Sequence, residues 1–110
     1  SVHFKDMMFF YKNELESSGI EYVVFGHVGD NHLHINFLPE EQDVSKAHEL
    51  YSRLVRQIID WNGTISAEHG IGKLKKKHFL MMVGEESVVQ LKAIKQIFDP
   101  KFILGKGNIF

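Results

Sequence analysis

The chain contains no cysteine among its 110 residues. Without thiols it forms neither a disulfide nor a thiolate metal site, so nitrogen and oxygen atoms must hold any bound metal. The formal net charge is only -1, which argues against nucleic-acid binding, because nucleic-acid-binding domains are usually strongly basic. No apolar run approaches the roughly 20 residues that a membrane-spanning helix needs. These absences favour a cytoplasmic protein that does not bind nucleic acid.

The composition that remains is typical of a small globular unit, with 44% apolar residues. A chain of this length buries only roughly 60–65% of its unfolded surface, so one modest core is expected. Apolar residues recur at helical spacing almost from the first residue, at Phe4, Met7 and Met8. We therefore interpret residues 1–110 as a single fragment of a larger domain.

The periodicity of apolar residues predicts an α+β fold. An antiparallel sheet with helices packed on one face is expected, as a partial ferredoxin-like unit whose first strand lies upstream. The sheet would then have an open edge, which predicts a homo-oligomer formed through that edge. In chain order, the pattern predicts a helix over 4–18, strands over 22–25 and 33–37 around a turn at 29–31, a helix from Asp43 or Ser45 to Asn62, a strand over 63–66, and helices over 73–82 and 85–98.

Histidines are concentrated in the predicted hairpin. If the chain turns at Asp30 and Asn31, His27 lies directly opposite His34, with Cβ atoms roughly 4.5–5.5 Å apart. Two imidazoles at that distance can bind one metal ion through bonds of about 2.0–2.1 Å. Asn36 would lie on the same face. A lone histidine on a hairpin usually only faces solvent, but a pair across a turn favours a metal site.

His32 alternates with these residues but lies at the turn, where we interpret it as a bystander. A second polar cluster follows at residues 66–72. Glu68 would complete a His-His-Glu metal site with positions open for substrate, and His69 would be a base beside it. Taken alone, a helix-capping turn explains this cluster equally well. The run of lysines from Lys73 to Lys77 is interpreted as a solvated helix face, with attraction of anionic substrates, or docking to an acidic partner or a membrane surface, as the alternatives.

Three segments resemble the signatures of a known family. Gly26–Asn36, Glu68–Gly72 and the tail Asp99–Phe110 are similar to the C-terminal, substrate domain of FAD-linked oxidases. This family includes D-lactate dehydrogenases, the FAD subunit of glycolate oxidase and D-2-hydroxyglutarate dehydrogenase. The chain departs from the family at Asn31 and His32, where relatives often have glycine and asparagine.

The resemblance implies a role for each candidate residue. His27, His34 and Glu68 match the ligands of a divalent metal, with zinc or manganese expected. Asn36 matches a substrate-binding position and His69 matches the catalytic base. The implied reaction oxidises a D-2-hydroxy acid, lactate- or glycolate-like, to a 2-oxo acid, and the hydride passes to FAD.

The resemblance also implies partners. FAD would be bound by an upstream domain of the same protein, and no cofactor-binding residue is identified in this chain. The isolated chain is therefore expected to be inactive and free of flavin, while the parent enzyme could attach peripherally to a membrane. Two alternatives stay open from the residues themselves. One is a metal-dependent hydrolase with the same His-His-Glu site, and the other is a non-catalytic ferredoxin-like binding module.

Overall fold

The structure, a computed structural model, describes residues 3–66 and 68–110. Ala67, inside the second predicted cluster, lies outside the described residues. The chain divides into two compact units, Ser1–Gly63 and Thr64–Phe110, and each is described by itself.

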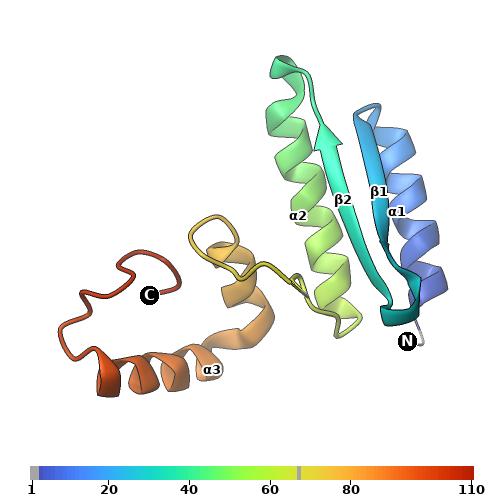
Figure 1. Cartoon of the computed structure of the whole chain (residues 1–110). Coiled ribbons are helices and arrows are strands. Elements are labelled where there is room, and N and C mark those ends of the chain that lie inside the picture. Colours follow the sequence, from blue (N-terminus) through green and yellow to red (C-terminus); the bar gives the residue numbers. More distant parts are fainter. Residues whose placement is uncertain (1–2, 67) are drawn as a thin grey trace. The chain divides into compact units, whose positions relative to one another are not determined.

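The first unit is a hairpin covered on one face by two helices (Figure 1). β1 and β2 pair antiparallel, and both helices lie on the same side of the pair. This arrangement confirms the predicted α+β class. In chain order the unit contains α1 (Phe4–Ser18), β1 (Glu21–His27), the short 3-10 helix η1 (Val28–Asp30), β2 (His32–Leu38), the short 3-10 helix η2 (Glu41–Asp43) and α2 (Val44–Asp60).

The core lies between the helices and the inner face of the hairpin. On α2 the buried residues recur at helical spacing, so that one stripe of the helix faces inward. On β2 every second residue faces the helices, as the alternating pattern predicts. The buried cluster comprises Tyr11, Leu15, Ile20, Ala47, Leu50 and Leu54, and the hairpin residues Tyr22, Leu33, Ile35 and Phe37 pack against it.

Both helices of this unit end at a residue in the left-handed conformation. Gly19, with φ of 70°, ends α1 at the predicted position. At the end of α2, Asn62 takes φ of 54° and donates its backbone N–H to the Ile59 carbonyl, while Gly63 donates to the Ile58 carbonyl. This pair of hydrogen bonds is the Schellman motif, and it closes the first unit.

The strand predicted over 63–66 is absent from the described residues, so that prediction was wrong. The segment instead forms local hydrogen bonds. The Ser66 backbone N–H donates to the Thr64 hydroxyl at 3.4 Å, and that hydroxyl donates to the Ser66 carbonyl at 3.3 Å. Hydroxyl side chains compete in this way with the backbone hydrogen bonds of a sheet, and here they outweigh the β-propensity of Thr64 and Ile65.

The second unit is built on α3 (Lys76–Phe98). Gly84 interrupts this helix with φ of 77° and ψ of 166°, so the two segments predicted on either side of it are both present. The change of direction is visible in Figure 1. The first segment begins at Lys76, three residues later than predicted. In the turn before it, the backbone N–H groups of Lys75 and Lys76 donate to the carbonyls of Ile71 and Lys73, both at 3.4 Å.

Asp99 connects α3 to the C-terminal tail. Its carboxylate accepts hydrogen bonds from Lys95 at 2.7 Å and from the backbone N–H groups of Ile103 and Leu104 at 3.0 Å. The hydrogen bond from Lys95, followed by those from the two backbone groups, lowers the pKa of Asp99 below its ordinary value. Lys95 also donates to the Leu104 carbonyl at 2.7 Å, so both Asp99 and Lys95 form hydrogen bonds to the C-terminal tail.

Among the described residues, no helix combines the length and apolar character needed to cross a bilayer.

The first prediction concerns the core of the first unit. Leu50 is 1% exposed, and we expect Leu50→Ala to lower the free energy of unfolding by about 2–5 kcal/mol, because it removes buried apolar surface and leaves a cavity. Fluorescence of Trp61, the single tryptophan, reports on this unit during urea unfolding. Leu74, 95% exposed, supplies the matched control, and Leu74→Ala should change stability by less than about 0.5 kcal/mol. Equal effects of the two substitutions would contradict the assigned core.

The second prediction concerns alkaline pH. Burial, and then repulsion from Tyr51, raises the pKa of Tyr11 from 10.0 to about 12. Between these two pKa values Tyr11 is ionised in the unfolded chain and neutral in the folded chain. The contribution of Tyr11 to stability is therefore fully present below pH 10 and is lost as the pH rises toward 12. The loss reaches roughly 2–3 kcal/mol near pH 12.

Tyr11→Phe should flatten this decline when urea unfolding is followed by circular dichroism from pH 9 to 12. Burial also raises the pKa of Tyr51, so Tyr51→Phe should remove a smaller part of the slope. An unchanged slope in Tyr11→Phe would show that Tyr11 does not cause it.

Candidate metal and catalytic site

The hairpin register differs from the predicted one. His27 lies opposite His32, and His34 lies opposite Phe25, so the expected direct pairing of His27 with His34 was wrong. The connection uses four residues, η1 and then Asn31, which adopts φ of 52°. A two-residue turn had been expected. The pairing is therefore shifted by two residues, and such a shift leaves each side chain on the face predicted for it.

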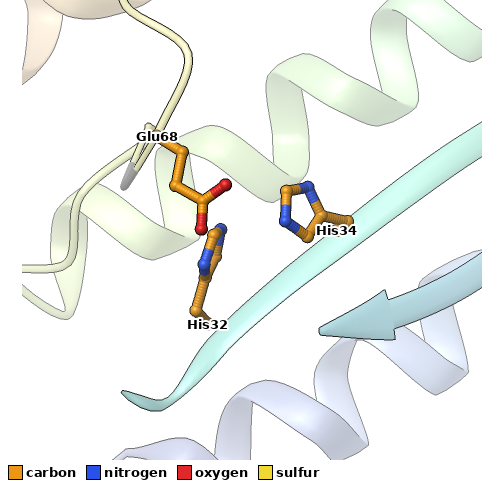
Figure 2. A group of neighbouring side chains, drawn as sticks. All are labelled: His32, His34 and Glu68. Carbon is orange, nitrogen blue, oxygen red and sulfur yellow. The ribbon is translucent and has the colours of Figure 1, made fainter. Parts of the chain in front are cut away.

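The outer face of the hairpin carries the imidazoles. The ring centroids of His32 and His34 are 4.4 Å apart, and those of His27 and His32 are 6.0 Å apart. Figure 2 shows His32 and His34 extending from the same side of β2; Glu68, drawn with them, belongs to the second unit. Asn36 follows on this face, opposite Val23. His27 and His34 are diagonal neighbours, a relation in which longer side chains still reach one another.

Phe25 fixes the orientation of one imidazole. Its ring stacks on that of His34, with centroids 4.9 Å apart and planes inclined by 11°. Phe25 remains 52% exposed, so this aromatic side chain lies on the outer face beside the histidines and outside the core. The stacking restricts how the His34 ring turns and therefore where its nitrogens point.

The donors on this face suit a borderline divalent cation. Ligand nitrogens of His32 and His34 lie within 4.8 Å of one another. Two nitrogens bound to one ion through bonds of about 2.0–2.1 Å are at most about 4.2 Å apart, so a small side-chain rotation brings both within reach. Imidazole prefers zinc and its transition-metal neighbours over calcium or magnesium. The face therefore fits a metal ion of that class.

The loop before α3 carries the other candidate residues. Ser66 organises it, because its hydroxyl donates to the Glu68 carbonyl at 2.5 Å and accepts a hydrogen bond from Lys75 at 3.2 Å. His69, Gly70 and Gly72 all adopt positive φ, at 64°, 54° and 57°. Glycine does this at little cost, but a non-glycine residue held in this region is uncommon and often marks a functional site.

Glu68 and His69 are close to one another and open to solvent. The Glu68 carboxylate oxygen lies 3.6 Å from Nε2 of His69, and their side chains are 47% and 74% exposed. Both groups can therefore reach a substrate or an ion. The arrangement suits a carboxylate that binds a cation next to an imidazole that accepts a proton.

Comparison with known proteins identifies the family. A family model described as FAD linked oxidases, C-terminal domain, matches residues 3–109. The chain belongs to this family.

Several curated proteins are similar to this oxidase domain. D-lactate dehydrogenase (cytochrome), mitochondrial, from Kluyveromyces lactis is 33% identical over 107 residues, which are 97% of this chain and 19% of that protein. D-2-hydroxyglutarate dehydrogenase from Xanthomonas citri pv. viticola is 37% identical over 93 residues, which cover 80% of this chain and 20% of that protein. Glycolate oxidase subunit GlcD from Bacillus subtilis is 31% identical over 94 residues, which cover 83% of this chain and 20% of that protein. The chain thus spans about one fifth of the length of these relatives.

The oxidase domain carries its predicted site residues on two segments. His27, His34 and Asn36 share the outer face of the hairpin, as the alternating pattern predicts. Glu68 and His69 lie on the loop that begins the second unit. Their roles as ligands, base and substrate contact remain predictions.

Sequence reasoning missed two contacts in the oxidase domain. His32, interpreted as a bystander, has the imidazole nearest to His34. The alternation of residues 32, 34 and 36 already contained this signal, but the assumed turn placed His32 at the end of the hairpin. Lys75 was interpreted only as part of a solvated lysine run, but its side chain donates a hydrogen bond to the Ser66 hydroxyl in the loop that carries Glu68.

A third prediction concerns the close approach of the two strands beside the histidines. A Cβ added at Gly26 would overlap the His32 carbonyl oxygen and lie 2.9 Å from Cα of Leu33. We expect Gly26→Ala to separate the strands, lower stability by about 1–3 kcal/mol and speed amide exchange in β2. At Gly29 an added Cβ would meet no described atom within 4 Å, so Gly29→Ala is the matched control. Equal stability of the two variants would refute the close approach.

Proposed function

We propose that this chain is the substrate- and metal-binding part of a flavin-dependent dehydrogenase. The proposed reaction converts a D-2-hydroxy acid, lactate- or glycolate-like, to the 2-oxo acid. The observation that carries the proposal is the row of imidazoles on the outer hairpin face of an FAD-linked oxidase domain. The relatives are named for D-lactate, D-2-hydroxyglutarate and glycolate, which are all 2-hydroxy acids, and this supports the substrate class.

In this proposal His27, His34 and Glu68 bind one divalent cation, zinc or manganese. Two nitrogen donors and one carboxylate leave coordination positions open for a substrate. The bound ion would supply Lewis acidity, which stabilises negative charge developing on the α-hydroxyl oxygen. The donor set supports this assignment, as does the position of His27 and His34 as diagonal neighbours on one face of the hairpin.

The remaining site residues act on the substrate directly. His69 accepts the α-hydroxyl proton on its imidazole, and its exposed side chain beside Glu68 supports that role. Asn36, exposed on the histidine face, donates a hydrogen bond from its side-chain amide to a substrate oxygen. FAD held by an upstream domain would accept the hydride from the α-carbon.

The proposal extends to partners and location. Since the chain spans about one fifth of its relatives, an upstream FAD-binding domain of the same protein is its principal proposed partner. The proposed location is cytoplasmic, with peripheral membrane attachment of the parent enzyme. Self-association through the open edge of the two-stranded sheet stays a prediction, and size-exclusion chromatography of the isolated chain measures it.

The fourth prediction tests the base. In the longer protein that contains this chain and a flavin domain, we expect His69→Ala to lower kcat by about 10²–10⁴-fold with D-lactate or glycolate, because proton removal is lost. KM should change only a few-fold, since the ligands that bind the substrate remain. Turnover is followed with an artificial electron acceptor, and His48→Ala on the exposed side of α2 is the control.

Two outcomes would contradict the proposal. Turnover of His69→Ala within a few-fold of the unsubstituted enzyme would place the base elsewhere. Failure of every 2-hydroxy acid to bleach the flavin absorption under anaerobic conditions would exclude the dehydrogenase and favour the metal-dependent hydrolase. The isolated 110-residue chain, expected to lack flavin absorption and activity, provides the baseline.

A further inference from the structure

A cavity of about 460 Å³ lies in the second unit, between the two segments of α3 and the C-terminal tail. Pockets that bind small molecules usually have volumes of about 300–1,000 Å³ and mostly apolar walls with a few polar groups. Two lysines, Lys76 and Lys92, line this cavity. Its other described walls are apolar, and they are formed by Leu80, Val88, Phe102, Ile109 and Phe110. The cavity therefore has the size and the composition of a small-molecule site.

The sequence places each lysine on the same helix face as an aliphatic residue. Lys76 and Leu80 are four residues apart on the first segment of α3, and Val88 and Lys92 are four residues apart on the second. Side chains at this spacing are neighbours on a helix surface. Gly84 joins the two segments with φ of 77° and ψ of 166°, a conformation that is essentially restricted to glycine. The interruption of α3 thus allows both faces to line one cavity.

Phe102 belongs to the wall that the C-terminal tail contributes. It adopts φ of 50°, which is an uncommon and strained conformation for a bulky residue. Its backbone N–H donates to the Asp99 carbonyl at 2.9 Å, and Nζ of Lys95 lies 5.5 Å from the centroid of its ring. These contacts hold the aromatic ring at the cavity wall, and backbone strain of this kind is concentrated at sites that bind ligands.

The two lysines give the cavity a positive charge. Nζ of Lys92 lies 5.7 Å from the centroid of the Phe110 ring, within the range of a cation–π attraction, and Lys76 is partly buried. Within residues 3–66 and 68–110, no acidic side chain lines the cavity and neither lysine forms an ion pair with a carboxylate. Both ammonium groups are thus available to an anion, while their hydrocarbon stems extend the apolar wall.

We propose that this cavity binds a small amphipathic monocarboxylate. The ammonium groups of Lys76 and Lys92 attract the carboxylate, and the hydrocarbon body of the ligand lies against the apolar walls. Because both lysine stems are flexible, the two ammonium groups can approach one carboxylate. All the lining residues belong to the second unit, so the proposal does not rest on the dehydrogenase or on the histidines of the hairpin.

Octanoate is the probe, because it combines a carboxylate with a hydrocarbon chain. Titration of the complete 110-residue chain, followed by NMR, should show saturable binding at a single site. Octanol carries a hydrocarbon chain of the same length without the charge. It should bind at least about tenfold more weakly, because a hydrogen bond to a charged group contributes more than a neutral one. Equal affinity for octanoate and octanol would overturn the proposal.

Substitutions separate the cavity from general attraction to a lysine-rich surface. Lys76→Gln and Lys92→Gln each keep most of the stem but remove the charge, and each should weaken octanoate binding by about tenfold or more. Lys77→Gln is the matched control, because Lys77 is exposed and does not line the cavity. This control should bind octanoate within about twofold of the unsubstituted chain, since an exposed charge outside the site contributes little. Equal losses in Lys76→Gln and Lys77→Gln would indicate non-specific attraction and overturn the site.

A second measurement covers the case in which a substitution perturbs folding. In the unsubstituted chain, octanoate should shift the methyl NMR signals of the cavity residues Leu80, Val88 and Ile109. The methyl signals of Leu50, in the core of the first unit, should stay unchanged. Unshifted cavity methyls would contradict the proposed site. Absence of octanoate binding, together with cosedimentation of the chain with phosphatidylglycerol vesicles, would replace the small ligand by a membrane surface.

Discussion

The packing of α1 and α2 on one face of the β1–β2 hairpin is the interaction on which the first unit depends. Each apolar side chain buried there contributes roughly 1.5–3 kcal/mol, while an isolated hairpin is marginally stable at best. Because strand side chains alternate, burying Leu33 and Ile35 directs His32 and His34 outward. The row of imidazoles thus owes its position to the core behind it.

The second unit is organised on a different basis. Asp99 is the only buried residue among those described there, and hydrogen bonds to its carboxylate connect α3 with the tail. Large apolar side chains remain open, with Ile97 76% and Phe98 81% exposed. The second unit therefore has little buried core of its own among the described residues.

The proposed chemistry needs both a packed hairpin and an exposed loop. Metal ligands must be held at fixed separations, and the packed hairpin supplies that rigidity to its imidazoles. A base must approach the reacting hydroxyl closely, and the loop carrying His69 presents it with an exposed side chain and a left-handed backbone. The Ser66 hydroxyl and the Lys75 ammonium hold this loop in place.

The sequence by itself determined the bounds of α1, the inward and outward faces of β2, the interruption of α3 near Gly84 and the family motifs. Each of these follows from local periodicity, from glycine conformations or from residue spacing. Only the tertiary structure decided the partner of His27 and the loss of the strand over 63–66. A register shift of two residues leaves the alternating pattern unchanged, so the pattern could not distinguish His32 from His34. That choice depended on the conformation of four turn residues and on the close approach of the strands at Gly26.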